Sequence, residues 1–563
     1  MFFGIISVIM FNRRFIAMDK FKISFKYTAN GVNYSSNFFE TDHYSMSTVA
    51  NNDHIRIVLN TKGVPLSNLK FKMTVPFSYD CNDRIFLNGY QSWTDCRELF
   101  IDEIGVNMHT ARLIPLLFSP MGASGDYTFK KYDQRKGVFH GYSYAYIRNG
   151  ETVNLFGSLS ERSGYTIINT VCPESKIVFE KELEGVTIDG EYVLMDIIHF
   201  TGTMDEVFDK YFEVMKIEKP RAKRANGYTT WYNYYSNVNE NIVINDLEAL
   251  SKVDAQIDFF QIDDGFQTAV GDWLSIDSKK FPNGMKYIAD RIHEKGMKAG
   301  LWLAPLGAQY QSKVAKEHPE WLIKDKFGKP VKCGMNWGGF YGIDINNPEA
   351  REYVRHFFDV VLNEWSYDMV KLDFLYAASI VPGYNKSRGQ LMCEAMDFIR
   401  ECVGDKLILG CGVPLAPAFG KVDYCRIGAD MGLNWNKNFG IHREDVSTRA
   451  ALGNSIFRRG LDGRAFLNDP DVFLLRDNNM KMTLPQRKII ANINRIFGSL
   501  LFISDNVDEY DDEKMQTLLK MFNSKKPELI TAEFVTNDLV EIQYIDEDGK
   551  QRLSFNIKTG EIY

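Results

Sequence analysis

The alternation of apolar and polar positions divides the chain into two parts. From about residue 20 to residue 215, short runs with a period of two, such as FKISFKYTA, IRIVLNT and LKFKMTVPF, are separated by turns rich in Asn, Gly and Asp. This pattern is typical of an antiparallel β-sandwich. The basic, proline-bearing segment at 216–226 then has the composition of a linker between domains.

After residue 227, runs typical of strands alternate with runs typical of helices. Strands are predicted at GYTTW, IDFFQID, MKAGLWLAP, YDMVKLDFL, KLILGCG, VDYCRIGAD, RAFLND and SLLFIS. Helices are predicted near 240–252, at VAKEHPEWL and near 388–403, 445–459 and 484–496. This rhythm over about 280 residues predicts a (β/α)8 TIM barrel, because no GxGxxG or P-loop run supports a doubly wound sheet.

The predicted fold is therefore multidomain. We expect an N-terminal antiparallel β-sandwich over 18–220, a central catalytic barrel over 221–510 and a small C-terminal β domain over 511–563. Residues 1–17 contain an apolar run that is followed, not preceded, by arginines and is too short to span a membrane. We interpret these residues as a mis-called start, with a leader or anchor as the alternative.

Charge and cysteine content narrow the function classes. The formal net charge is -7, and no long basic patch is present, which argues against nucleic acid as a partner. The eight cysteines are scattered without a CxxC pair, as expected of a reduced, cytoplasmic protein. No stretch reaches the roughly 20 apolar residues of a membrane-spanning helix, so no membrane partner is predicted.

Carboxylates stand at the ends of predicted barrel strands, where the active sites of such barrels collect. Asp263 and Asp264 follow one apolar strand, although a helix cap or turn would also explain them. Lys371 and Asp373 are two positions apart on another strand and therefore point to the same side. A lysine beside a carboxylate favours its ionised form, which a nucleophile requires; a structural ion pair is the alternative.

A further strand ends in Arg426 and Asp430, where the arginine could serve only to balance the carboxylate. Other chemistries lack support: the nine histidines show no HxH or HExxH spacing, no GxSxG run is present, and Cys411 has no evident histidine partner. We therefore predict no metal and no cofactor. Two carboxylates in different environments are the minimum for glycoside cleavage.

Together with NGYQSW at 88–93, the runs IDDGFQ, KLDF and RIGAD resemble glycoside hydrolase family 36 and its clan relatives in family 27, over most of the chain. These families comprise α-galactosidases and α-N-acetylgalactosaminidases. The resemblance implies that Asp373 is the nucleophile and Asp430 the acid/base. The other sugar ligands that it implies are Asp263 and Asp264 at O4 and O6 of galactose, Lys371, Arg426 and Trp93, a tryptophan that would otherwise be a core residue.

Some positions depart from the family pattern, and others have a structural or undecided role. Phe266 stands where the family often has tryptophan, and the loop that begins at Cys411 differs near the C2 substituent of the sugar. The choice between galactose and N-acetylgalactosamine therefore stays open. In AFLNDPDVFLLR, Asp469 is interpreted as structural support. Three tryptophans at or after strand ends are either stacking walls for a sugar or core residues: Trp231, Trp302 and Trp337.

The expected function is that of a retaining exo-α-galactosidase acting on α-galactoside oligosaccharides. The alternatives are an α-N-acetylgalactosaminidase and an α-galactosyl transferase like raffinose synthase. A non-catalytic binding protein is disfavoured because both Asp373 and Asp430 are present. A homo-oligomer fits the family, although no sequence stripe identifies an interface.

Overall fold

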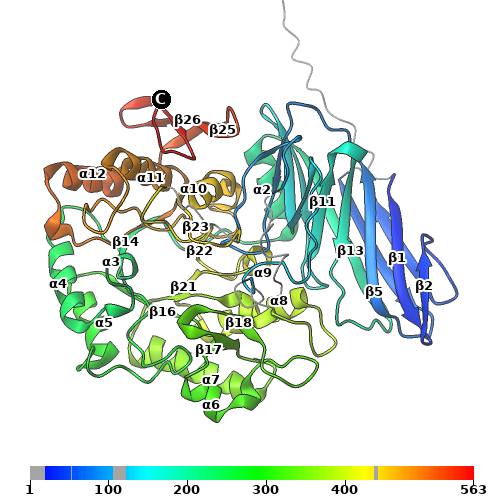
Figure 1. Cartoon of the computed structure of the whole chain (residues 1–563), viewed down its shortest axis with the longest axis horizontal. Coiled ribbons are helices and arrows are strands. Elements are labelled where there is room, and N and C mark those ends of the chain that lie inside the picture. Colours follow the sequence, from blue (N-terminus) through cyan, green and yellow to red (C-terminus); the bar gives the residue numbers. More distant parts are fainter. Residues whose placement is uncertain (1–19, 52, 106–121, 436–441) are drawn as a thin grey trace, which may run out of the picture.

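Two antiparallel sheets form the N-terminal part of the chain, blue to cyan in Figure 1. The computed structural model describes residues 20–51, 53–105, 122–435 and 442–563. Within these residues, one sheet has the order β2 (Val32–Ser36), β1 (Lys22–Ala29), β5 (Ser67–Pro76), β12 (Lys176–Lys181), β11 (Thr166–Val171) and β8 (Val138–Tyr142). The other has the order β3 (Tyr44–Ala50), β4 (His54–Thr61), β13 (Glu191–Gly202), β10 (Thr152–Ser158), β9 (Tyr144–Asn149), β6 (Arg84–Leu87) and β7 (Leu99–Phe100). The inward-facing side chains of alternate positions, Phe25, Ile57 and Phe71 among them, form a core between the sheets, which confirms the predicted sandwich.

Eight parallel strands form the central barrel. Their spatial order is β23 (Leu467–Asp469), β22 (Tyr424–Arg426), β21 (Leu407–Gly410), β20 (Met369–Leu372), β16 (Lys298–Leu303), β15 (Phe259–Ile262), β14 (Ala225–Thr229) and β24 (Leu500–Ile503). The ring closes through the amide of Ser499, which donates to the carbonyl of Asn468 at 2.8 Å. The predicted TIM barrel is confirmed.

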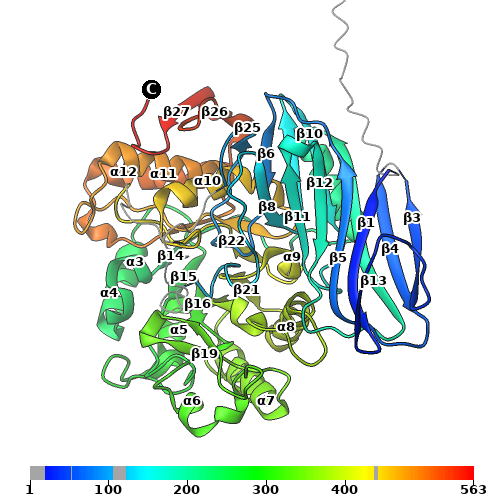
Figure 2. The same ribbon diagram turned by 45° about the vertical axis from the view of Figure 1, so that its right-hand side comes forward.

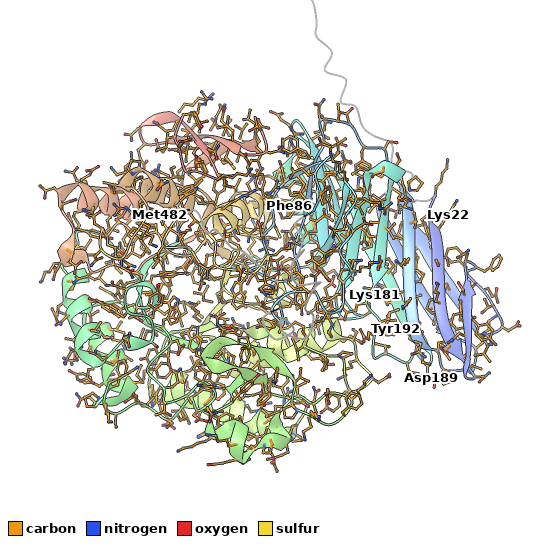
Figure 3. All side chains as sticks on the ribbon, viewed as in Figure 1. Lys22, Phe86, Lys181, Asp189, Tyr192 and Met482 are labelled. Carbon is orange, nitrogen blue, oxygen red and sulfur yellow. The ribbon has the colours of Figure 1, made fainter. Side chains whose placement is uncertain are left out.

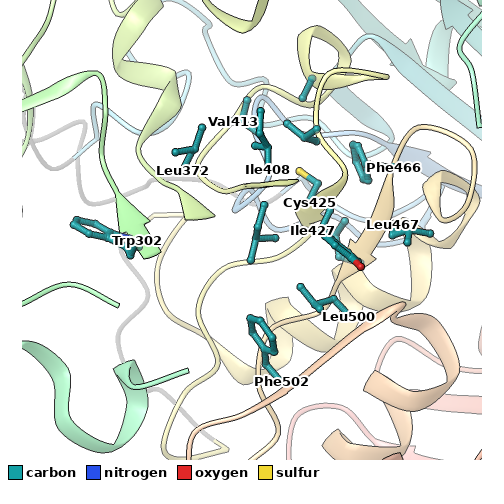
Figure 4. Close-up of a cluster of buried hydrophobic side chains, with 14 of the residues drawn as sticks. Trp302, Leu372, Ile408, Val413, Cys425, Ile427, Phe466, Leu467, Leu500 and Phe502 are labelled. Carbon is teal, nitrogen blue, oxygen red and sulfur yellow. The ribbon is translucent and has the colours of Figure 1, made fainter. Parts of the chain in front are cut away.

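Helices surround the barrel strands, and apolar side chains of the strands are buried in a common core. Figure 4 shows Leu372, Ile408, Cys425 and Leu500 from four different strands pointing into one buried cluster. The surrounding helices are α3 (Trp231–Tyr234), α4 (Glu240–Leu250), α5 (Gly284–Glu294), α7 (Pro348–Asp359), α8 (Arg388–Val403), α9 (Leu415–Ala418), α10 (Thr448–Phe457), α11 (Leu484–Phe497) and α12 (Asp512–Asn523). Both α8 and α11 begin at capping boxes, in which a Ser or Thr and a Gln satisfy each other's free backbone amides.

An antiparallel insertion between β16 and β20 was not predicted from the sequence. Its three short strands are β17 (Gly307–Gln309), β18 (Lys332–Gly334) and β19 (Phe340–Gly342). The helix expected at VAKEHPEWL is only α6 (Lys313–Glu317), because the residue before Pro319 is disfavoured from helical geometry. The insertion stands over the carboxyl end of the barrel and brings a tryptophan to it.

The seven-stranded sheet packs directly against the barrel (Figure 2). Phe86, labelled in Figure 3, and Tyr144 belong to the same apolar cluster as the barrel core, together with Phe208 of α2 (Met204–Met215). At this junction the fully buried guanidinium of Arg458, at the end of α10, donates to the backbone carbonyls of Gln91, Ser92 and Ile427. The loop that carries NGYQSW is thus fixed onto the barrel.

A small antiparallel sheet forms the C-terminal part, red in Figure 1. Its order is β25 (Glu528–Phe534), β26 (Leu539–Asp546) and β27 (Gly549–Asn556). The indole of Trp435 anchors it by donating to the carbonyl of Ile557 at 3.0 Å. In the part of the chain that the structure describes, no helix is both long and apolar enough to cross a bilayer. The expected leader or mis-called start at 1–17 lies outside that part.

Candidate active site

A cavity of about 310 Å³ opens at the carboxyl end of the barrel strands. Most of the residues predicted from the sequence line it: Trp93, Trp231, Asp263, Asp264, Trp302, Trp337, Lys371, Asp373 and Asp430. Arg426 and Cys411 lie directly behind this lining. A larger cavity, about 610 Å³, lies along the sandwich, but it contains none of the predicted residues, and its lining mixes lysines, arginines and carboxylates without a convergent centre. The smaller cavity is therefore the candidate active site.

Asp373 is held rigidly just after β20. Its amide donates to the carbonyl of Leu303 at 2.8 Å, and its carboxylate accepts from the indole of Trp302 at 3.1 Å and from the amide of Phe374 at 2.9 Å. Burial raises the pKa of Asp373, while the charge of Lys371 and the hydrogen bonds it accepts oppose that rise. The carboxylate is thus desolvated and fixed, with both oxygens oriented by donors.

Lys371 forms its direct ion pair with Asp263 rather than with Asp373. Its ammonium nitrogen lies 2.9 Å from Asp263 Oδ2, an oxygen that also accepts from Gln261 at 2.8 Å. Burial alone would lower the pKa of Lys371, but the negative charges of Asp263 and Asp373 outweigh it, so the pKa is raised. The lysine therefore stays a cation, as the sequence argument required, and acts on Asp373 through space.

Asp264 is gripped by two donors. The indole of Trp337 lies 2.7 Å from Oδ2, and the amide nitrogen of Gln267 lies 2.6 Å from Oδ1. Burial raises the pKa of Asp264. The adjacent Gly265 has φ +125, and a Cβ there would lie 2.7 Å from the carbonyl of Ser236, so the tight turn needs glycine. Asp264 is thus both a turn residue and part of the cavity wall.

Trp337 reaches the site from the unpredicted insertion. Its backbone has φ +57, a left-handed conformation that costs free energy for a residue with a Cβ. Its ring contacts those of Trp302 and Phe374, with centroids 5.9 and 4.8 Å apart. Backbone strain held by ring contacts and by the bond to Asp264 is typical of a functional site.

Asp430 has a different environment from Asp373. Its Oδ1 lies 2.9 Å from Nη2 of Arg426, and its side chain is 36% exposed, whereas Asp373 is buried. The buried guanidinium of Arg426 also contacts Asp471. The cavity thus presents one desolvated carboxylate and one that is partly open to solvent, so the two carboxyls have unlike environments.

The N-terminal domain completes the cavity through Trp93. Its indole nitrogen donates to the thiol of Cys411 at 3.3 Å, and its ring packs edge-on against Phe374. A Cβ at Gly412 would lie 2.8 Å from the Trp93 ring, so this loop and the tryptophan are closely fitted. Trp231, at the start of α3, lines the cavity and is half-buried.

Several residues that line the cavity were not predicted from the sequence, because most of them lie on loops or in short elements without a periodic pattern. Those that line the cavity are Ser124, Gly334, Met335, Asn336, Phe374, Tyr376, His442, Glu444, Asp445 and Val446. Glu444 accepts from the hydroxyls of Thr94 and Tyr127, each at 2.8 Å, and burial raises its pKa to about 7. No local sequence pattern indicates Glu444, because both of its hydroxyl donors come from the N-terminal domain.

The NDPD run at 468–471 contains a second aspartate, Asp471, that the sequence analysis did not predict as a site residue. Asp469 accepts from the amide of Asp471 at 2.8 Å and does not line the cavity, whereas Asp471 contacts Arg426. Asp471 lies two residues after the end of β23, and this position near a strand end could have indicated a site residue.

Phe266 is fully buried and also outside the cavity lining. Among the described residues, no group of three or more His, Cys, Asp or Glu is arranged to hold a metal ion.

Fold and site together define a (β/α)8-barrel protein whose strand ends present several carboxylates, a lysine and tryptophans to one small cavity. Residues 202–389 match the model of the melibiase family. The match confirms the resemblance to glycoside hydrolase family 36 inferred from the sequence.

Relatives match parts of the chain, and solved structures share its fold. An α-galactosidase of Lactobacillus acidophilus is 32% identical over 124 residues, 21% of this chain and 16% of that protein, and one of Escherichia coli is 27% identical over 179 residues, 30% and 24%. The chain thus spans less than a quarter of these relatives. The Thermus thermophilus α-galactosidase, solved with p-nitrophenyl α-D-galactopyranoside, has a TM-score of 0.69 at 23% identity, covering 90% of this chain and 98% of that one. A family 36 α-galactosidase of Geobacillus stearothermophilus has a TM-score of 0.61 at 13% identity, covering 94% and 81%. These structures share the fold of this chain.

Proposed function

We propose that this protein is a retaining exo-α-galactosidase that removes terminal α-linked galactose from oligosaccharides or glycoconjugates. The observation that carries the proposal is that Asp373 and Asp430, in unlike environments, line one cavity with Asp263, Asp264 and Lys371. A volume of about 310 Å³ is at the small end for ligand pockets, which suits a terminal sugar better than the middle of a polymer.

In the proposed mechanism, a carboxylate oxygen of Asp373 attacks C1 of the galactosyl unit while Asp430 protonates the departing glycosidic oxygen. Asp430 then takes a proton from water, which attacks C1 of the galactosyl-enzyme and releases α-galactose with Asp373 free again. The rigid hydrogen bonds to both Asp373 oxygens favour an attack from one fixed direction. Because the side chain of Asp430 is partly exposed, it can exchange protons with water between the two steps.

The other polar groups of the cavity are proposed as hydroxyl ligands. Asp263 and Asp264 accept from the sugar, Lys371 donates, and Arg426 supports Asp430 from behind. The indoles of Trp93, Trp231, Trp302 and Trp337 form the apolar walls, against which the C–H faces of a sugar can pack. A cavity with these polar groups and apolar walls is suited to bind a neutral, hydroxyl-rich oligosaccharide.

Two alternatives share the scaffold. An α-N-acetylgalactosaminidase is not favoured: the relatives are mainly described as α-galactosidases, although a galactosaminidase of Flavonifractor plautii is 32% identical over 124 residues, 11% of its length. A transferase like raffinose synthase would require an acceptor that outcompetes water.

The test compares release of p-nitrophenol from the α-galactoside and from the α-N-acetylgalactosaminide, with and without an acceptor sugar. The wild type is expected to cleave the galactoside, to prefer it over the N-acetylated analogue, and to yield free galactose. Asp373→Ala should abolish this release. Glu364→Gln, a change at an exposed carboxyl outside the cavity lining, should not. Activity on the N-acetylated substrate alone, or product only when acceptor is present, would replace the proposal by the corresponding alternative.

A further inference from the structure

Arg426 is shared between two carboxylates. Its Nη2 lies 2.9 Å from Asp430 Oδ1 and 3.1 Å from Asp471 Oδ2. The arginine side chain is 2% exposed and that of Asp471 5%, against 36% for Asp430. One buried cation therefore faces one buried anion and one carboxyl that opens onto the cavity.

This arrangement bears on how a general acid keeps its proton. A cation at hydrogen-bond distance favours the ionised form of a carboxyl, whereas the first step of glycoside cleavage needs Asp430 protonated. A single guanidinium next to a single carboxylate would form a balanced pair and leave no reason for that carboxyl to hold a proton. A second carboxylate on the same guanidinium, ionised at neutral pH, lets the guanidinium charge be balanced without Asp430.

Three hydrogen-bond donors converge on the carboxylate of Asp471. Its Oδ2 accepts from the amide of Met431 at 2.7 Å and from the hydroxyl of Tyr232, besides the contact with Arg426. The titratable groups that face it are Arg426, Asp430, Asp469 and Tyr232. Burial raises the pKa of Asp471 from 3.8 to about 6, although the charge of Arg426 and the hydrogen bond from Tyr232 oppose that rise, so the carboxyl is ionised above that pH. Three donors converge on one oxygen, which is how proteins hold a buried carboxylate charged.

The backbone of Asp471 supports the same conclusion. Its φ is +80, in the left-handed region that favours glycine, and such strain persists where the surroundings over-determine a residue. Its amide donates to Asp469 at 2.8 Å and its carbonyl accepts from Asn494 at 2.9 Å. Because Met431 directly follows Asp430, the Asp471 carboxylate also fixes the chain beside that residue.

We propose that Asp471 is the counter-ion of Arg426, a positioning residue that neutralises the guanidinium so that Asp430 can carry the proton it delivers to the leaving group. This inference rests on the proposed function, in which Asp430 is the acid/base. Without the Asp471 charge, Asp430 becomes the counter-ion of Arg426 and loses its proton at lower pH. Steps that need protonation of the leaving oxygen then slow, and steps that do not need it proceed.

The test uses Asp471→Asn, because asparagine tolerates a left-handed backbone and has the same shape. We expect kcat/KM for melibiose, whose leaving sugar needs a proton, to fall at least tenfold more than kcat/KM for p-nitrophenyl α-galactoside, whose leaving group is a stable anion. The alkaline limb of the melibiose pH profile should move to lower pH. Tyr232→Phe is the graded comparison, since it removes one of the three donors to the same oxygen and leaves Arg426 in place; its extra loss on melibiose should be smaller than that of Asp471→Asn.

A second readout needs no substrate. The infrared absorption of protonated carboxyl groups is followed against pH in the wild type, Asp430→Asn and Asp471→Asn. The band that Asp430→Asn removes should disappear at lower pH in Asp471→Asn than in the wild type. Equal losses on both substrates with an unmoved pH limb, or an unchanged infrared titration, would overturn the inference. If the wild type cleaves neither substrate, the proposed function fails, and the infrared titration alone decides whether Asp471 balances Arg426.

Discussion

The indole nitrogen of Trp93 donates a hydrogen bond to the thiol sulfur of Cys411 at 3.3 Å, joining the N-terminal sandwich to the loop after β21. The cavity wall is therefore shared by two domains, and neither domain alone supplies the whole site. The same junction holds the Trp93 ring edge-on against Phe374, the residue after Asp373.

Trp93→Phe keeps an aromatic ring and removes this one donor. A hydrogen bond contributes about 1 kcal/mol net, so we expect KM for p-nitrophenyl α-galactoside to rise about fivefold while kcat changes less. Trp435→Phe is the matched control, because it removes an indole donor to the carbonyl of Ile557 from a residue that does not line the cavity, and it should leave KM unchanged. An equal effect of both variants on KM would contradict a local role for the Trp93 bond.

Arg458→Met tests the anchoring of the NGYQSW loop to the barrel. The change leaves three buried carbonyl acceptors without their donor, so we expect the free energy of unfolding to fall by about 3–5 kcal/mol, measured by denaturant titration. The neighbouring Arg459 donates to the carbonyl of Ile456 in its own turn, so Arg459→Met should cost about 1 kcal/mol or less. Similar losses for the two variants would show that the junction does not depend on Arg458.

Glu444 makes stability depend on pH. Burial raises its pKa from 4.5 to about 7, so the folded protein binds a proton between these pH values that the unfolded chain releases. The contribution of this carboxyl to folding is therefore most favourable below pH 4.5 and declines by about 3 kcal/mol as pH rises to 7.

Glu444→Gln should remove that decline from the unfolding free energy measured across this range. Glu364→Gln, a change at an exposed carboxyl, should retain the wild-type slope. If Glu444→Gln and the wild type lose stability in parallel as pH rises, the proton is not held by Glu444.

The barrel and its main carboxylates could be predicted because each signal is local. A strand such as MVKLDF has its apolar run and its terminal aspartate within a few residues, and α8 combines a serine cap with helical periodicity, so the expected helix near 388–403 matches Arg388–Val403. Asp373 and Asp430 needed only their strands and the rule that barrel sites collect at one end.

Other parts of the site depend on contacts that no local pattern contains. The three-residue strands of the insertion are too short to show a period, and its Trp337 is held in a left-handed backbone by Asp264 and neighbouring rings. Glu444 is defined by hydroxyls from the other domain, and Asp471 by Arg426 and Tyr232. The domain limits drawn at 220 and 510 and the association of several copies stay predictions.

The most direct test of the account is to trap the galactosyl-enzyme and find the residue that carries it. A 5-fluoro-α-galactosyl fluoride slows both steps by disfavouring positive charge at the sugar ring, while its reactive fluoride lets the first step proceed, so the intermediate accumulates. The proposed mechanism predicts a single 5-fluorogalactosyl label that peptide mass spectrometry places on Asp373. A label on any other residue, or turnover with inversion and no label, would contradict it.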